Sequence, residues 1–347
     1  MAHLRTIRRF ATAAAAAAAS LALVATPALA WGPDGHREVG SLGDRMIKKH
    51  PNAAKQVRAI MGDIKLADAG PWADCIRSVS GPDGGFKYTH SPIYGAPCVK
   101  FETAELTAQM EDYVKRNWSN CAYKGKDGCH TQYHFVDLAL QRSAYRLGEV
   151  GTYDYDVVHG IDAAIATLRG EPTPAPFNFT KRDALMMLVH FLGDIHQPLH
   201  VGSIYLDPDG HEVDPDSSQA ERDRAEKVTS TFGGNSLTWM EKDKQKNLHS
   251  TWDGVTPGDY SVADARKVAA TQGPDTAWAG DWATDSLVQA QQHSFPGLSF
   301  GARAGRSWPI SFTNKVRYQA DRKKIQRLQI EKAGARLTQL LLDIWPD

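Results

Sequence analysis

The stretch from Leu188 to His200, LVHFLGDIHQPLH, constrains the fold more than any other part of the chain. A helix turns by about 100° per residue, so His190 and Asp194, four positions apart, share one face of an otherwise apolar helix. Pro198 ends this helix because it lacks an N–H and clashes with the preceding turn, and His200 can then turn back toward the same point. Imidazoles and carboxylates at this spacing are what a zinc site requires, although hydrogen-bonded histidines in a buried helix would produce the same pattern.

The first thirty residues are expected to be an export signal rather than part of the fold. Arg5, Arg8 and Arg9 precede an Ala-rich apolar run, and the sequence ALA at 28–30 matches a cleavage site. The run is short for a membrane span and is followed by polar sequence. We therefore predict a signal peptide over residues 1–30, no membrane anchor after its cleavage, and a secreted or periplasmic protein.

Cleavage after Ala30 would make Trp31 the first residue and would change the net charge. The whole chain has 40 basic and 40 acidic residues. The leader holds three arginines and no acid, so the remainder has 40 − 3 = 37 basic residues against 40 acidic ones, a net charge of −3. Proteins that hold nucleic acid by lysine and arginine alone are normally basic. If this chain acts on a polyanion, another source of positive charge, such as metal ions, is required.

Four cysteines occur, at Cys75, Cys98, Cys121 and Cys129. An even number in an exported protein predicts disulfides, for which three connectivities are possible. We favour pairing of near neighbours, Cys75 with Cys98 and Cys121 with Cys129. No C-x-x-C spacing is present, which disfavours a cysteine-based zinc site.

Helical periodicity recurs along most of the chain, without internal repeats and without alternating strands and helices. We therefore predict an all-α, mainly helical fold in a single domain. Residues 202–230 are polar and read as a surface excursion, and 232–240 (FGGNSLTWM) could form a strand. Besides the helix that Thr180 caps, helices are predicted at 36–49, 51–61, 102–118, 132–148, 156–168, 262–271, 276–293 and 313–345.

Residue types that bind metal recur away from the central stretch. His249 and Asp253 repeat its four-residue spacing, which again places two ligand types on one helical face. A free α-amino group at a new N-terminus is also a good ligand once a metal has lowered its pKa. The remaining candidates are Asp74 on a short helix, His134, and Trp31 with His36 on either side of a tight turn.

Six motifs follow one another in order: WGPDGH at 31–36, PWADCIR at 71–77, YHFVD at 133–137, LVHFLGDIHQPLH at 188–200, FGGN at 232–235 and NLHSTWD at 247–253. Together they resemble the secreted, single-strand-specific tri-zinc nucleases of the mung bean nuclease type, the nuclease S-one/P-one family. The resemblance implies a helical bundle of the zinc phospholipase C and tri-zinc nuclease type over residues 31–347. Residues 80–130 and 202–230 look like insertions into it, and the C-terminal third matches only as helices.

The resemblance also implies three Zn²⁺ ions per chain. The first would be bound by Asp74, His134, His190 and Asp194. The second would be bound by the amino and carbonyl groups of Trp31, by His36 and by the other oxygen of Asp194. The third would be bound by His200, His249 and Asp253.

The activity that the resemblance implies is hydrolysis of phosphodiester bonds in single-stranded DNA and RNA by a monomer. A zinc-activated water would attack phosphorus in line and leave 5′-phosphorylated products, with 3′-nucleotidase activity as a second candidate. Asp74, Asp194 and Arg77 would be catalytic, Arg77 by donating to the phosphate. A base would be bound by Phe135, Asp137, Phe232, Gly233, Gly234 and Asn235.

Other interpretations stay open. Phe135 could be ordinary core packing, and Arg77 could form a surface salt bridge. A zinc phospholipase C would have the same fold but is expected to carry Glu at position 253 and to lack the base-binding residues. A non-catalytic exported zinc-binding protein would have closed four-ligand sites, whereas catalytic zinc keeps an open position.

Overall fold

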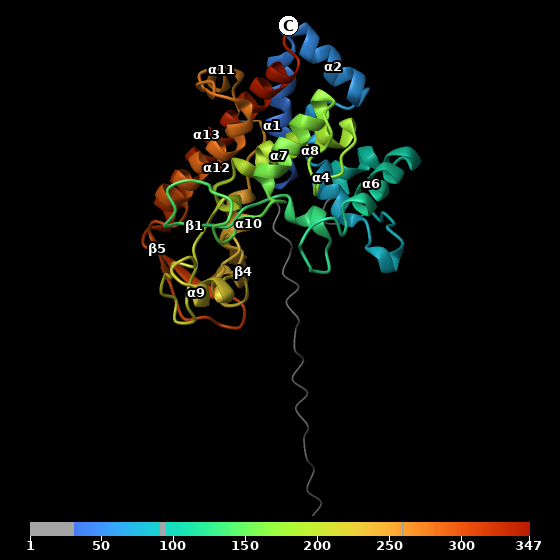
Figure 1. Ribbon diagram of the computed structural model, residues 1–347. Coiled ribbons are helices and arrows are strands. Elements are labelled where there is room, and N and C mark those ends of the chain that lie inside the picture. Colours follow the sequence, from blue (N-terminus) through green and yellow to red (C-terminus); the bar gives the residue numbers. More distant parts are fainter. Residues whose placement is uncertain (1–30, 91–94, 259) are drawn as a thin grey trace, which may run out of the picture.

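The computed structural model describes residues 31–90, 95–258 and 260–347, and the protein is mainly helical, as predicted (Figure 1). The predicted signal peptide lies outside the described residues. Among the described residues, no helix has the length and apolar character needed to cross a membrane.

Helix α8 (Lys181–Ile195) is the centre of the fold and carries the stretch discussed above. Every residue from Asp183 to Ile195 is buried, as expected of a helix that is apolar on most of its circumference. It begins at a capping box, in which Asp183 N–H donates to Thr180 Oγ1 (3.1 Å) and Thr180 N–H donates to Asp183 Oδ2 (2.9 Å). It ends before Pro198, which starts the short 3₁₀ turn η5 (Pro198–His200).

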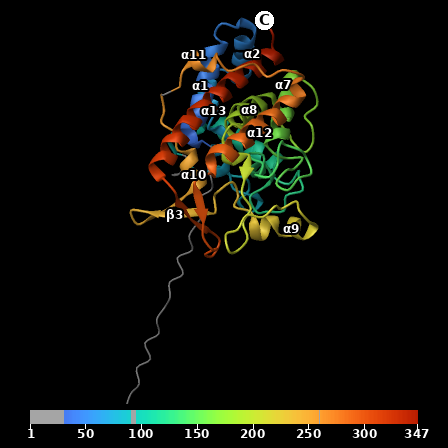
Figure 2. The same ribbon diagram turned by 90° about the vertical axis from the view of Figure 1, so that its left-hand side faces the viewer.

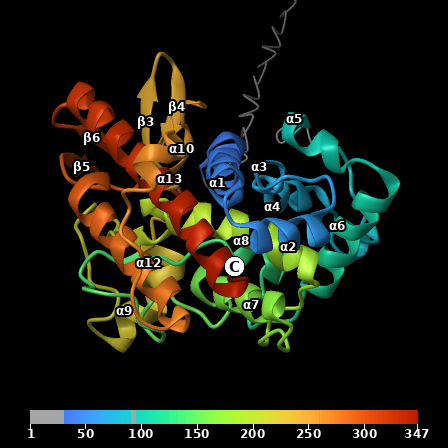
Figure 3. The same ribbon diagram turned by 90° about the horizontal axis from the view of Figure 1, so that it is seen from above.

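The other long helices surround α8 and pack against it (Figures 1 and 3). Thus the apolar side chains of helices far apart in the sequence form one core around the residues of α8. These helices are α1 (Gly32–Ile47), α2 (Pro51–Met61), α7 (Val157–Arg169), α12 (Asp275–Gln289) and α13 (Lys315–Ile344).

Shorter elements build the flanks of the bundle and connect its helices. They are α3 (Leu66–Ala69), α4 (Trp72–Cys75), η1 (Ile76–Ser78), η2 (Pro82–Gly84), α5 (Gly95–Cys98), η3 (Val99–Phe101), α6 (Ala104–Arg116), η4 (Cys129–Gln132), α9 (Gln219–Arg224), η6 (Ala225–Thr229), α10 (Leu248–Asp253), α11 (Val262–Ala265) and η7 (Ala290–Ser294). The predicted disulfides, Cys75–Cys98 and Cys121–Cys129, are both confirmed.

A small mixed sheet with the strand order β4-β3-β6-β5 lies at one end of the helices (Figure 2). Its strands are β3 (Leu237–Glu241), β4 (Lys244–Asn247), β5 (Leu298–Phe300) and β6 (Trp308–Phe312). It packs with α10 on a second apolar cluster that includes Leu248, Trp252 and Trp308. Of these strands, the sequence had indicated only the first.

Two predicted helices are wrong in whole or in part. Residues 132–148 are not a helix: Val136 N–H donates to His200 O and Leu138 N–H donates to Val201 O, both at 2.9 Å. This pairing holds the segment extended and forms the parallel pair β1 (Leu138–Ala139) and β2 (Gly202–Ser203). The predicted helix at 262–271 ends at Ala265, because Thr271 is bound by both its N–H and its C=O to Gln339 of α13.

Candidate metal centre and substrate pocket

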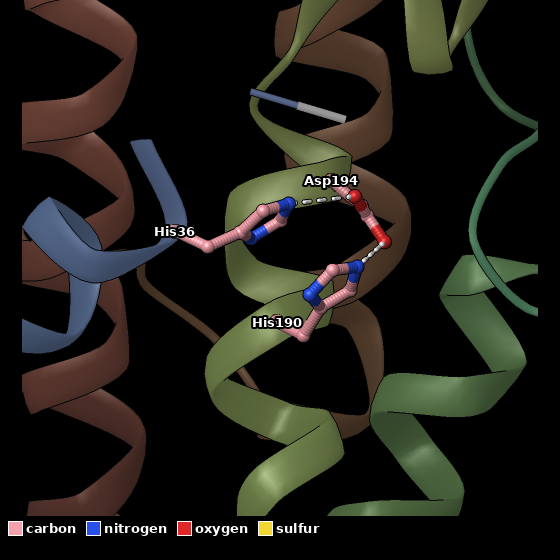
Figure 4. A group of neighbouring side chains, drawn as sticks. All are labelled: His36, His190 and Asp194. Carbon is pink, nitrogen blue, oxygen red and sulfur yellow. Dashed lines mark ion pairs between the residues drawn. The ribbon is translucent and has the colours of Figure 1, made fainter. Parts of the chain in front are cut away.

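The two carboxylate oxygens of Asp194 face different histidines. Oδ2 lies 2.9 Å from His134 Nδ1 and 3.2 Å from His190 Nε2, whereas Oδ1 lies 3.5 Å from His36 Nε2. Figure 4 shows His36 facing one oxygen of this carboxylate and His190 facing the other. All four side chains are buried, so each oxygen of Asp194 faces buried imidazole nitrogens of a different element.

Several helices bring these groups together. His190 and Asp194 lie one turn apart on α8, and His36 of α1 stacks on His190 with a ring-centroid distance of 3.7 Å. Gly193 makes this approach possible, because a Cβ at that position would lie 2.4 Å from His36 Nδ1. Trp31 is fully buried beside the same glycine, where its Nε1 donates to Gly193 O at 2.7 Å.

The site contains many buried polar atoms that have no hydrogen-bond partner in the described part of the chain. Buried polar groups are nearly always satisfied, so such a concentration fits a group of side chains that bind a cation. The atoms are both ring nitrogens of His36, Asp74 Oδ2, His134 Nε2, His190 Nε2, Asp194 Oδ1 and Asp253 Oδ2.

The tautomers of three histidines point to the same conclusion. His200 Nδ1 donates to His134 O (2.9 Å), and His249 Nδ1 donates to Gly233 O (2.8 Å). In a neutral imidazole the other nitrogen then carries a lone pair, yet His200 Nε2 and His249 Nε2 lie 3.0 Å apart. His190 Nδ1 likewise donates to Gly70 O, at 2.8 Å, and turns its lone pair toward Asp194. The lone pairs of His200 Nε2 and His249 Nε2 face each other, and they repel unless a cation lies between them.

A second potential ligand group is formed by His200, His249 and Asp253, with ligand atoms within 4.8 Å of one another. Asp253 Oδ1 accepts a hydrogen bond from Gln197 Nε2 at 2.8 Å, which orients the carboxylate in the way that outer partners orient metal ligands. Burial raises the pKa of Asp253 well above its ordinary value, although Gln197 and the Trp31 N–H oppose this shift. The Trp31 N–H therefore lies beside the Asp253 carboxylate.

The electrostatics of the first group favour the forms that bind metal. Burial alone would raise the pKa of Asp194, but the surrounding imidazoles, led by His190, hold it well below its usual value. Burial lowers the pKa of His134 to about 4, against the opposing effect of Asp194. Burial raises the pKa of Asp74 to about 6, against the opposing charges of His190 and Arg77. His134 is thus a neutral ligand at pH 7, and Asp74 is ionised more readily beside a cation.

Helix α13 fixes the position of α10, the helix that carries His249 and Asp253. Its buried Gln326 donates from Nε2 to Trp252 O and to Gly254 O, the latter at 3.0 Å. Arg322 donates to Gly254 O at 3.2 Å and also to Thr251 O. These contacts, and that of Gln197 with Asp253, could not be inferred from the sequence, because no motif links residues 56 to 74 positions apart.

A cavity of about 180 Å³ opens beside His134, His200 and His249. Of the residues predicted to contact phosphate or base, the structure brings five to its wall: Arg77, Phe135, Asp137, Phe232 and Asn235. Arg77 makes no hydrogen bond or ion pair within residues 31–90, 95–258 and 260–347, so its guanidinium is available to a ligand.

The predicted glycines shape this wall rather than line it. Gly233 and Gly234 have positive φ angles of 56° and 83°, and a Cβ on Gly233 would lie 2.1 Å from Leu199 O. The turn therefore requires glycine. Burial raises the pKa of Asp137 to about 7, with a further contribution from Glu226 and opposition from the Gly233 N–H, so this carboxyl can both donate and accept near neutral pH.

Leu199 and three residues near the second disulfide, Asp127, Thr131 and Gln132, also line the cavity, and none of them was predicted as a site residue. Asp127 lies in the loop that the Cys121–Cys129 disulfide closes, and Thr131 and Gln132 lie just after this loop. Gln132 Nε2 donates to Thr131 Oγ1 at 3.0 Å, and Thr131 Oγ1 donates to Gly128 O at 2.8 Å. Their position just before His134 in the sequence was the only available signal.

A third group of potential ligands, Asp207, Asp209 and His211, lies away from this centre and is largely exposed. Asp207 Oδ1 already accepts from the N–H groups of Asp209 and His211, both at 2.9 Å. This carboxylate stabilises its own turn, and we assign it no metal.

Comparison with known proteins agrees with this geometry. The family model described as S1/P1 Nuclease matches residues 31–346. The chain belongs to the S1/P1 nuclease family. It is 25% identical over 229 residues to Endonuclease 4 of Arabidopsis thaliana, an alignment that covers 66% of this chain and 56% of that protein. Endonuclease 5 of the same plant is 22% identical over 234 residues, with the same coverage. Endonuclease 1 is 26% identical over 156 residues, covering 42% of this chain and 38% of the relative.

Proposed function

We propose that this member of the S1/P1 family is a zinc-dependent endonuclease that cleaves single-stranded DNA and RNA to 5′-phosphorylated products, with 3′-nucleotidase activity at the same site. The observation that carries the proposal is the Asp194-centred group of orphaned ligand atoms beside a cavity that contains Arg77 and Phe135. Residues 31–347 would form one catalytic domain that acts as a secreted or periplasmic monomer after removal of residues 1–30.

Three zinc ions are the proposed cofactors. The donor set contains only imidazole, carboxylate and main-chain groups, which suits zinc. The ions would be held as the family resemblance implies: by Asp74, His134, His190 and Asp194; by Trp31, His36 and Asp194; and by His200, His249 and Asp253.

Zinc at such a site supplies a water of lowered pKa and positive charge for the reacting phosphate. The protein contributes orientation and further charge. Arg77 would donate two parallel hydrogen bonds to phosphate oxygens, which suits a planar guanidinium. Its lack of a partner among the described residues supports this role. Gln197 would hold Asp253 in place through their 2.8 Å hydrogen bond.

The pocket supports a preference for single strands. Phe135 is partly exposed in the cavity wall, where a base could stack on it at a gain of about 1–3 kcal/mol. Asp137 and Asn235 would bind the edge of that base. A base of a duplex must leave its stack to enter the pocket, so binding of paired nucleic acid requires additional free energy.

Two other functions are less well supported. A zinc phospholipase C has no need for an aromatic pocket with Asp137 and Asn235 on its wall, and Asp253 stands where glutamate is expected. A non-catalytic zinc protein would have no use for a cavity beside the ligands, or for an arginine in its wall that no described residue pairs with.

Metal analysis combined with product mapping tests the proposal. We expect about three zinc ions per chain, 5′-phosphorylated products from single-stranded DNA and RNA, and no cleavage of phosphatidylcholine. His134→Ala should lose zinc and nuclease activity together, whereas His211→Ala, in the exposed group, should lose neither. Full activity of metal-depleted His134→Ala would refute the assignment. Cleavage of phosphatidylcholine would favour the zinc phospholipase C alternative.

A further inference from the structure

The β3–β4 hairpin connects the two sides of the site. Strand β3 begins two residues after Asn235, and β4 leads directly into α10, which carries His249. The strands pair in antiparallel register, with Trp239 opposite Lys246 and Glu241 opposite Lys244. In Figures 2 and 3 the hairpin projects from the body of the protein beside α10. Any long ligand that leaves the cavity on this side passes close to it.

The hairpin carries unpaired positive charge. Lys242, Lys244 and Lys246 are exposed, and none of them forms an ion pair among the described residues. Glu241, which could neutralise them, is already bound by Lys315 of α13. With Lys315 included, four lysines face two acids, Glu241 and Asp243, so the local net charge is +2 in a chain whose formal net charge is zero.

Apolar side chains are interleaved with these lysines. Because residues opposite each other in a sheet share a face, Trp239 lies on the face of Lys244 and Lys246. Lys315 Nζ lies 5.6 Å from the Trp239 ring centroid. Met240, on the other face, is 66% exposed. Cations along a ridge with aromatic and apolar groups between them are typical of surfaces that bind single-stranded nucleic acid without reading its sequence.

We propose that the β3–β4 hairpin binds the phosphate backbone of the strand that continues beyond the pocket, so that the protein prefers long single strands to minimal substrates. This rests on the proposed nuclease function. Lys242 follows Asn235 by seven positions, which span at most about 24 Å of extended chain, so a strand that leaves the pocket reaches the hairpin within a few nucleotides. The lysines can therefore contact several successive phosphates.

The test compares a hairpin variant, Lys242→Gln/Lys244→Gln/Lys246→Gln, with the wild type at a series of salt concentrations. A matched control, Lys48→Gln/Lys49→Gln/Lys55→Gln, removes three exposed lysines from the region of α1 and α2, at the opposite end of the molecule (Figure 1). The substrates are a dinucleotide and a single-stranded oligonucleotide of about ten residues, within the range of typical single-strand site sizes.

For the hairpin variant we expect KM for the oligonucleotide to rise about tenfold at low salt, as three exposed charge contacts warrant. The slope of log KM against the logarithm of the salt concentration should fall in magnitude by about 2, since each phosphate contact contributes about 0.7 to this slope. KM for the dinucleotide should change less than twofold, and the control should behave as the wild type. Equal thermal unfolding of all three proteins shows that the fold is intact.

An unchanged salt dependence of the hairpin variant, or an equal change in the control, would overturn the proposal. So would binding of the wild type, but not the variant, to anionic phospholipid vesicles with no difference on the oligonucleotide, because the surface would then be a membrane contact. A wild type that cleaves neither substrate would instead refute the proposed function itself.

Discussion

Replacing Gln326 by leucine should weaken zinc binding by His200, His249 and Asp253, although Gln326 lies on α13, which carries none of these ligands. Gln326 is 3% exposed and donates to Trp252 O and Gly254 O. In the variant Gly254 O keeps its donor from Arg322, but Trp252 O loses the donor from Gln326. A buried carbonyl left without a hydrogen-bond donor costs about 1–3 kcal/mol, so the free energy of unfolding should fall by about 2 kcal/mol. Asp253, which follows Trp252 directly, should lose its fixed position, and zinc affinity should fall about 10- to 100-fold at that site.

Chelator titration of the zinc-loaded protein, followed with a zinc-sensitive dye, measures the affinity, and urea unfolding measures the stability. Gln339→Leu is the matched control, because Gln339 lies on the same helix and also binds main chain, through Thr271 N–H and Thr271 O. We expect both variants to lose comparable stability, but only Gln326→Leu to release one zinc early. Indistinguishable zinc release from the two variants would refute the idea that α13 positions α10.

Further variants test the pocket, a buried carboxyl and the N-terminus. Phe135→Ala should raise KM for single-stranded DNA about 5- to 100-fold, in line with about 1–3 kcal/mol of stacking, without a comparable effect on a minimal phosphodiester; equal effects would indicate core packing. Burial, aided by Asp156 and Asp275, raises the pKa of Asp162 to about 7. The unfolded chain releases this proton at a lower pH than the folded protein does. The free energy of unfolding should therefore fall as the pH rises from about 4 to about 7, by about 1.4 kcal/mol per unit of pKa difference. Asp162→Asn should remove that loss, and equal pH profiles of unfolding for the two proteins would contradict the assignment. Extra residues left before Trp31 convert its amine into an amide and should lower zinc content and turnover; normal zinc content would exclude the amine as a ligand.

Local sequence predicted the parts of the site that lie on single elements. The i, i+4 pairs His190/Asp194 and His249/Asp253 depend only on helical geometry. The capping box at Thr180 and the stop at Pro198 mark the ends of α8 for equally local reasons. The resemblance added Trp31, His36, Asp74 and His134, and the structure gathers them at the same centre, although their roles as ligands stay predictions.

The failures came from segments whose conformation depends on distant partners. Residues 132–148 have helical periodicity, but main-chain pairing with His200 and Val201 holds the segment that carries Phe135 and Asp137 extended. The strands β5 and β6 were missed because their hydrogen bonds are made with each other and with β3. Tertiary contacts of this kind override local preference.

By itself the sequence determined a mainly helical chain with a central ligand-bearing helix, two disulfides and a family, because these depend on spacing and composition. Only the tertiary structure decided how Asp194 divides its two oxygens between histidines of different elements, and which outer residues, Gln197 and Gln326 among them, hold the group of His200, His249 and Asp253. It also decided that Asp127, Thr131 and Gln132 reach the pocket and that the lysines of the hairpin stand beside it. These features depend on distances between residues that lie far apart in the chain, and such distances arise only when the core around α8 is packed.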